Sequence, residues 1–133
     1  MAVSLSALVE RLWRALGWLW VALLCVGSVA PSVPLPMGDG GDKFWHAAAY
    51  AGLMWWWAQL YGAPPARRRA AAALVALGVL LEGVQGLTAW RQPDAWDAAA
   101  NALGVVCGAL VARGRAGRVL AALRAWLQGT DQR

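Results

Sequence analysis

The stretch AAAALVALGVLLEGVQGLTAW, residues 70–90, is an apolar run interrupted by the polar side chains of Glu82 and Gln85. A helix of about 20 residues, at a rise of about 1.5 Å per residue, crosses the roughly 30 Å hydrocarbon core of a bilayer. In lipid, an isolated apolar segment of this length is stable only as a helix, because a helix pairs its backbone N–H and C=O groups internally. Residues 70–90 are therefore predicted to form a transmembrane helix.

Three further apolar runs of similar length lie on either side of this stretch. They cover residues 15–30, 44–61 and about 95–112. Segments rich in proline and glycine, at 31–36 and 62–65, end the first two runs, and these residue types are typical of turns. No internal repeat or second domain is visible. The sequence predicts an all-α membrane protein with a single domain, residues 1–133, built as a bundle of four short transmembrane helices.

The composition excludes an ordinary soluble domain and argues against nucleic-acid binding. Hydrophobic residues make up 60% of the sequence and charged residues only 14%, and the mean hydropathy is +0.47. The net charge of +5 resides in short basic clusters between the apolar runs, as in membrane proteins. Cys25 and Cys107 lie inside apolar runs without the spacing of a metal or redox site, so we interpret them as buried apolar residues.

The distribution of basic residues predicts the orientation in the membrane. Ten of the twelve basic residues lie in the N-terminal segment, in the loop between the second and third runs, or after the fourth run. They are Arg11, Arg14, Arg67, Arg68, Arg69, Arg113, Arg115, Arg118, Arg124 and Arg133. Because loops rich in Lys and Arg stay in the cytoplasm, both termini and the central loop are predicted to be cytoplasmic. The two outer loops then hold only Lys43 and Arg91.

The two ends of the chain leave alternatives open. A basic N-terminal segment, the first apolar run and the small residues 28–30 resemble a signal peptide, but Pro31 directly after them argues against cleavage there. After Arg113, an apolar stripe beside several arginines predicts an amphipathic helix on the inner membrane surface, with a solvated tail as the alternative. The stripe consists of Val119, Leu120, Leu123 and Leu127.

Polar residues within the apolar runs share faces of the predicted helices. Ionisable groups at the bilayer centre cost roughly 2.5–3.5 kcal/mol, so their positions are informative. The faces comprise Asp42, Lys43, His46 and Tyr50 in the second run, Glu82 and Gln85 in the third, and Asp97, Asn101, Gly104 and Gly108 in the fourth, with Asp94 at the edge. All lie toward the outer ends of their helices, so we expect one polar cluster there. The two glycines are spaced to let the fourth helix approach a neighbour closely.

Ten residues are candidates for a binding site in this cluster. They are Asp42, Lys43, His46, Tyr50, Glu82, Gln85, Arg91, Asp94, Asp97 and Asn101. Lys43 and Arg91 are expected to neutralise carboxylates or to hold an anionic group such as a phosphate. His46, Glu82 and Asp97 are the candidates for catalysis, with interhelical hydrogen bonding as the alternative for each. No cofactor or metal is expected, and a metal held by those three residues is a minor alternative.

Three segments that carry these residues resemble the VanZ-like family of small bacterial membrane proteins. They are DKFWHAAAY at 42–50, LEGVQ at 81–85 and RQPDAWDAAANALG at 91–104. The resemblance covers about residues 42–110. It implies a multi-pass protein of the bacterial cytoplasmic (inner) membrane, in a family whose founding member is associated with resistance to the glycopeptide teicoplanin. It implies no known reaction.

Two functions of different classes follow. The first is a non-enzymatic envelope protein that modulates glycopeptide susceptibility, with membrane lipids or a lipid-linked envelope component as its partner. The alternative is an intramembrane hydrolase or transferase acting on a phosphate-bearing lipid or lipid-linked cell-wall intermediate, with Glu82 as general base and His46 as its acid–base partner. Since the cluster contains no Ser or Cys, activated water or a carboxylate would be the nucleophile. A homo-oligomer is left open, and only as an oligomer would four short helices form a channel.

Overall fold

The computed structural model describes residues 4–31 and 41–130, and every regular element in these two ranges is a helix. The elements are α1 (Leu5–Val29), α2 (Gly41–Ala58), α3 (Pro64–Gln85), α4 (Ala95–Val111), the 3-10 helix η2 (Arg115–Arg118) and α5 (Val119–Thr130). The all-α prediction is thus confirmed for the described residues. Arg133, which contributed to the predicted orientation, lies outside them.

The residues at the helix ends account for where the helices begin and stop. The Ser4 hydroxyl accepts a hydrogen bond from the Ala7 N–H at the start of α1. α3 begins with Pro64, whose fixed φ angle suits the first turn and which lacks the N–H that would have no partner there. At the other end, the Thr88 N–H and hydroxyl both donate to the Gln85 carbonyl in a turn. The prediction that the helix continues through residues 86–90 is therefore wrong, because this turn ends it.

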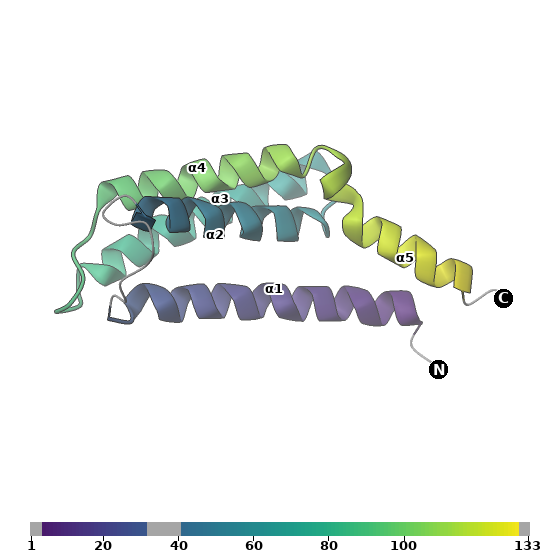
Figure 1. Cartoon of the computed structure of the whole chain (residues 1–133), viewed down its shortest axis with the longest axis horizontal. Coiled ribbons are helices and arrows are strands. Elements are labelled where there is room, and N and C mark those ends of the chain that lie inside the picture. Colours follow the sequence, from purple (N-terminus) through teal and green to yellow (C-terminus); the bar gives the residue numbers. More distant parts are fainter. Residues whose placement is uncertain (1–3, 32–40, 131–133) are drawn as a thin grey trace.

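α1, α2, α3 and α4 run along one long axis, and α2 packs most extensively against α4. Figure 1 shows α2, α3 and α4 as one group, with α1 running alongside it and α5 returning toward the N-terminal end of α1. Gly104 and Gly108 place α4 directly on the backbone of α2. A Cβ atom on Gly104 would overlap the Ala47 carbonyl oxygen, and one on Gly108 would overlap that of Ala51. The expected close approach is confirmed, and the neighbour is α2.

The buried core lies between α2, α3 and α4. Tyr50, Leu53 and Met54 of α2 are almost fully buried, and Leu74 of α3 and Val105 of α4 pack into the same cluster. The outward faces carry large apolar side chains. Examples are Leu12, Trp18, Leu23, Val26, Leu80, Leu103 and Val106. Large apolar side chains therefore occur both in the core and on the outward faces.

α1 is held to α2 by a pair of tryptophans. The rings of Trp13 and Trp56 stack with their centroids 3.9 Å apart. Each indole N–H donates to the backbone carbonyl of the other residue, at 3.1 and 3.0 Å. Because both indole donors are satisfied within the protein, this contact keeps polar groups paired on an otherwise apolar helix surface.

Among the described helices, α1 is the one that is long and apolar enough by itself to cross a membrane. It has 25 residues and is about 37 Å long at about 1.5 Å per residue. α4 together with the helical segment 115–129 also qualifies, but the two parts are bent by 77° at the break. Both segments qualify by their length and composition. The bend separates α5 from the long axis of the bundle, as Figure 1 shows.

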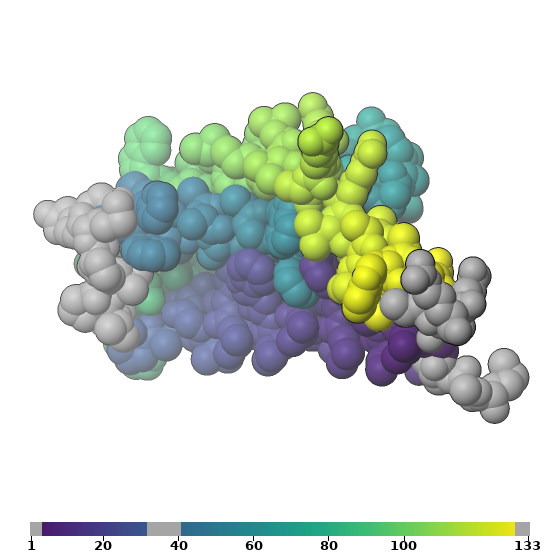
Figure 2. Space-filling view, turned by 45° about the vertical axis from the view of Figure 1, so that its right-hand side comes forward, coloured from purple at the N-terminus to yellow at the C-terminus, as the bar shows by residue number. Residues whose placement is uncertain are grey.

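α5 has one side against the rest of the chain and one side exposed. Leu120 is buried, and its N–H donates to the Gln59 side chain. Arg124 forms an ion pair with Glu10 of α1 at 2.9 Å. Trp126, by contrast, is 65% exposed. Figure 2 shows the yellow α5 residues against the purple beginning of α1. The predicted amphipathic helix is present.

Candidate functional site

The polar residues of α2, α3 and α4 gather at one end of the bundle. α2 and α4 both begin at this end and α3 finishes there, as Figure 1 shows at its left side. The parallel α2–α4 pair places the first turns of both helices next to one another. Residues near the starts of these two helices therefore meet, although about fifty positions separate them in the sequence.

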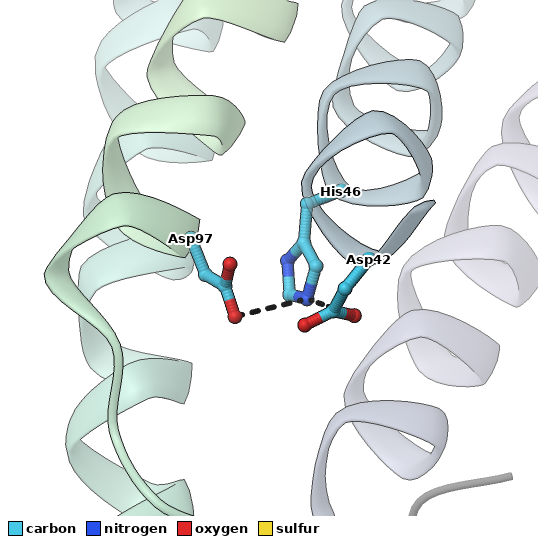
Figure 3. A group of neighbouring side chains, drawn as sticks. All are labelled: Asp42, His46 and Asp97. Carbon is cyan, nitrogen blue, oxygen red and sulfur yellow. Dashed lines mark ion pairs between the residues drawn. The ribbon is translucent and has the colours of Figure 1, made fainter. Parts of the chain in front are cut away.

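His46 lies at the centre of this cluster, between two carboxylates. Its Nδ1 is 3.1 Å from the Asn101 side-chain oxygen. Its Nε2 is 3.6 Å from an oxygen of Asp42 and 3.6 Å from an oxygen of Asp97. Figure 3 shows the imidazole pointing between these two carboxylates, one from its own helix and one from α4. Asn101 and Asp97 are buried, whereas the Asp42 side chain is half exposed, so the imidazole is shielded from solvent on its α4 side and accessible on the other.

Lys43 joins the same cluster on its exposed side. Its ammonium donates to Asp94 at 2.8 Å and to Asp97 at 3.2 Å. The hydrogen bond from Lys43 lowers the pKa of the Asp94 carboxyl, and a second hydrogen bond, from the Trp96 N–H at 2.8 Å, lowers it further. Asp94 is thus both the N-cap of α4 and an ion-pair partner.

Glu82 is buried and connects α3 to the start of α4. Its carboxylate accepts a hydrogen bond from the Asp94 backbone N–H at 3.1 Å. That N–H precedes the first turn of α4 and has no partner within the helix. Glu82 therefore supports the Asp94 segment, which in turn contacts Lys43. Nearby, the Tyr50 hydroxyl is buried and has no hydrogen-bond partner among the described residues.

Gln85 and Arg91 contact α1 instead of His46. The Gln85 amide donates to the Ser28 carbonyl at 2.8 Å, and Arg91 donates to the carbonyls of Ala30 and Gly27. The last turn of a helix leaves carbonyls without intrahelical partners, and these side chains satisfy them. The sequence analysis missed these contacts with α1, because the acceptors are backbone carbonyls, which every residue type carries.

A cavity of about 180 Å³ lies where α1, α2 and the end of α3 meet. Its lining combines apolar and polar side chains. The polar contributors are Ser28, Asp42, His46, Tyr50, Gln85 and Arg91. Glu82, Asp94 and Asp97 are not among the residues that line it. The cavity therefore gives a small ligand access to His46 and Arg91.

Comparisons with known proteins add no assignment. No family model, no curated protein and no solved structure matches the chain. The chemistry available at the site is therefore inferred from its side chains. They include an imidazole oriented by an amide, several carboxylates, and one ammonium group bound to two of these carboxylates. A cavity gives access to the imidazole.

Proposed function

We propose that this chain is a VanZ-like, multi-pass protein of the bacterial cytoplasmic membrane that modulates susceptibility to glycopeptides such as teicoplanin. Its working site is the polar cluster, placed at the outer leaflet. The observation that carries the proposal is the way in which residues of the three motif-like segments meet. Lys43 and His46 of the first segment contact Asp94, Asp97 and Asn101 of the third, and Glu82 of the second contacts the third as well.

The surface of the bundle supports four short membrane spans. Soluble monomers rarely expose large contiguous apolar patches, whereas this chain exposes large apolar side chains along α1, α3 and α4. α2, α3 and α4 contain 18, 22 and 17 residues. At about 1.5 Å per residue they are about 27, 33 and 26 Å long, close to the roughly 30 Å hydrocarbon core. Groups such as Asp97 and Glu82 are turned inward, as ionisable residues in membranes are.

Charge supports the proposed orientation. Arg67, Arg68 and Arg69 lie in the first turns of α3, and Arg113 follows α4, at the opposite end of the bundle from His46. Arg67 donates to the carbonyls of Tyr61 and Ala112, which joins the two loops at that end. By the positive-inside rule this end is cytoplasmic, and the polar cluster then belongs at the outer leaflet. α5 lies at the same basic end, where an amphipathic helix would rest on the anionic inner surface.

The proposal is tested by expressing the chain in a teicoplanin-sensitive bacterial host. The expected result is a several-fold rise in the minimal inhibitory concentration of teicoplanin relative to empty vector. Asp97→Asn should abolish this rise, because it removes the carboxylate that both Lys43 and His46 face. Glu10→Gln, the same chemical change at the opposite end of the bundle, is the control and should preserve it. Wild-type protein that reaches the membrane at normal abundance without altering susceptibility overturns the proposal.

A second candidate function is hydrolysis or transfer at a phosphate-bearing lipid or lipid-linked cell-wall intermediate. The cavity favours it, because His46 and Arg91 both line the same space. His46 is better placed than Glu82 to act as the general base, since Glu82 does not line the cavity. Incubation of the purified protein with phosphatidate-containing vesicles, followed by measurement of released phosphate, tests this function. His46→Gln should eliminate the release, and its persistence in that variant argues against the assignment.

A further inference from the structure

His46 and two carboxylates beside it place ligand-type atoms within the reach of one metal ion. Asp42 and His46 are one turn apart on α2, and Asp97 projects from the first turn of α4. One ligand atom from each lies within 4.8 Å of the other two, and the His46 Nε2 is 3.6 Å from each carboxylate. Ligands that bind Zn²⁺ tetrahedrally at about 2.0–2.1 Å are about 3.3–3.4 Å apart. The two distances from His46 need to contract by only a few tenths of an ångström to reach such a geometry. The Asp42 and Asp97 oxygens, which lie within 4.8 Å of each other, would move together by up to about 1.5 Å.

Asn101 orients the imidazole for coordination. An amide oxygen accepts hydrogen bonds, so its 3.1 Å contact with Nδ1 assigns the proton to Nδ1 and the lone pair of a neutral imidazole to Nε2. Figure 3 shows this side of the ring between the two carboxylates. In the neutral form of the imidazole, Nε2 and the two carboxylates are three acceptors that repel one another. A cation between them would convert this repulsion into attraction.

The charge of the cluster favours a divalent cation. Asp42, Glu82, Asp94 and Asp97 contribute four negative charges when all are ionised, and Lys43 is the one cation that pairs with carboxylates among the described residues of the cluster. Arg91 donates instead to the carbonyls at the end of α1. With a neutral imidazole and ionised carboxylates, the negative charges exceed the charge of Lys43 by three. A divalent ion would offset two of them.

The cavity beside the cluster provides an independent sign of a ligand. Asp42 and His46 line it, so an ion bound there would keep open positions for water or a substrate. Tyr50 lines the same cavity. Its hydroxyl is buried without a hydrogen-bond partner among the described residues, although the side chain is only 2% exposed. Buried hydroxyl groups are nearly always paired, so the Tyr50 hydroxyl is a polar group beside the cavity that a ligand would pair.

We propose that Asp42, His46 and Asp97 bind a divalent transition-metal ion, with Zn²⁺ as the first candidate, and that Asn101 orients His46 for this role. One imidazole nitrogen with two carboxylate oxygens is a donor set suited to Zn²⁺. The inference goes beyond the proposed function, because the site binds its ion whether or not the chain affects glycopeptide susceptibility. The metal would be held on the outer face, next to the cavity.

The test uses the full chain, purified without a histidine tag and reconstituted in lipid nanodiscs. Titration with Zn²⁺ against a chromogenic chelator should show one ion per chain. Asp42→Asn, His46→Gln and Asp97→Asn should each abolish binding or weaken it strongly. Asn101→Ala should weaken it by about 10–100-fold, the range for residues that orient a ligand. The control Glu10→Gln changes an acid outside the cluster and should bind as the wild type does.

A spectroscopic measurement keeps the proposal testable if the variants fail to fold. His46 is the only histidine in the sequence, so nitrogen coupling to bound Cu²⁺ in pulsed electron paramagnetic resonance can come only from this imidazole. The expected spectrum contains imidazole nitrogen coupling in the wild type. A wild-type protein that binds no Zn²⁺ overturns the proposal. So does binding that persists unchanged in folded His46→Gln, or bound Cu²⁺ without imidazole coupling.

Discussion

At the scale of single residues, each carboxylate of the cluster has a different task, set by what it contacts. Glu82 accepts from a backbone N–H, Asp94 combines a cap with an ion pair, and Asp97 faces both Lys43 and His46. These side chains all carry a carboxylate, and their hydrogen-bond and ion-pair partners give them different roles. Substitutions that keep the shape and remove the charge separate these tasks.

For Glu82 we expect the amide variant to behave differently from alanine. Glu82→Gln retains an oxygen that can accept from the Asp94 N–H, so the thermal stability should stay near that of the wild type. Glu82→Ala leaves that N–H without a partner, which costs about 1–3 kcal/mol for a buried donor. Thermal unfolding in detergent, followed by circular dichroism, measures the difference. An equal loss of thermal stability in both variants would mean that the negative charge of Glu82 is required.

Asp94 should make the stability dependent on acidic pH. Its pKa is lower in the folded chain than the ordinary value of about 3.9, owing to Lys43 and the Trp96 N–H. A lowered pKa means that the stabilisation is present above the ordinary pKa and is lost as the pH falls through the folded pKa. Asp94→Asn keeps a good N-cap but lacks the ion pair.

The measurement compares wild type and Asp94→Asn across this pH range. The wild type should unfold at a higher temperature near neutral pH, and the difference should shrink as the pH falls below about 4. Added salt should reduce the difference as well, because Lys43 and Asp94 are both partly exposed. A difference that grows on acidification contradicts this account.

At the scale of elements, the α2–α4 contact decides whether the cluster can form. The helices approach so closely that Gly104 and Gly108 lie on backbone atoms of α2. His46, Asp97 and Asn101 extend from the same two helices near their N-termini. Separation of the helices at the glycines would therefore also separate His46 from Asp97 and Asn101.

Gly104→Ala should destabilise the bundle by about 1–3 kcal/mol, the usual range for overpacking, because the added methyl group meets the Ala47 backbone. Gly83→Ala is the matched control. An added Cβ there meets nothing within 4 Å, and Ala is favoured over Gly in a helix by about 0.5–1 kcal/mol. Unfolding temperatures of the two variants should shift in opposite directions. A stable Gly104→Ala variant would show that α2 and α4 are farther apart.

At the scale of the whole molecule, polar and basic groups occupy opposite ends. The cluster around His46 lies at one end, and Arg67, Arg68, Arg69 and Arg113 lie at the other. For the membrane-spanning bundle that we propose, the positive-inside rule predicts that the basic end lies in the cytoplasm.

Reporter fusions test this topology in a bacterial host. Alkaline phosphatase fused after Arg113 should be inactive, since that end is expected in the cytoplasm, whereas fusion after Thr88 should be active. Immunoblotting of the full chain should also show that α1 is retained, as expected from Pro31 after the small residues. An active fusion after Arg113 contradicts the orientation, and loss of the first thirty residues would identify α1 as a cleaved signal peptide.

Much of the helical structure could be predicted from the sequence because it depends on local properties. The apolar runs and their polar faces indicated where α2, α3 and α4 lie and that His46, Asp97 and Asn101 would meet. The glycine spacing indicated a close helix contact. The predicted helix ends were less accurate. The third helix was predicted at residues 70–90, whereas α3 already includes the arginines before residue 70 and stops at Gln85. Caps and turns determine those ends, and apolar content does not detect them.

The partners of the polar side chains were decided only by the tertiary structure. Helical phase indicates the face of a side chain but not which neighbouring helix lies opposite or at what depth. Glu82 and Gln85 share one predicted face, yet one contacts the start of α4 and the other the end of α1. Asp42, not Glu82, accompanies Asp97 beside the His46 Nε2. The sequence by itself determined the helices and their polar faces, since both depend on residues that are neighbours in the sequence. The tertiary packing of α1, α2, α3 and α4 determined the side-chain contacts, since these join residues that are far apart in the sequence.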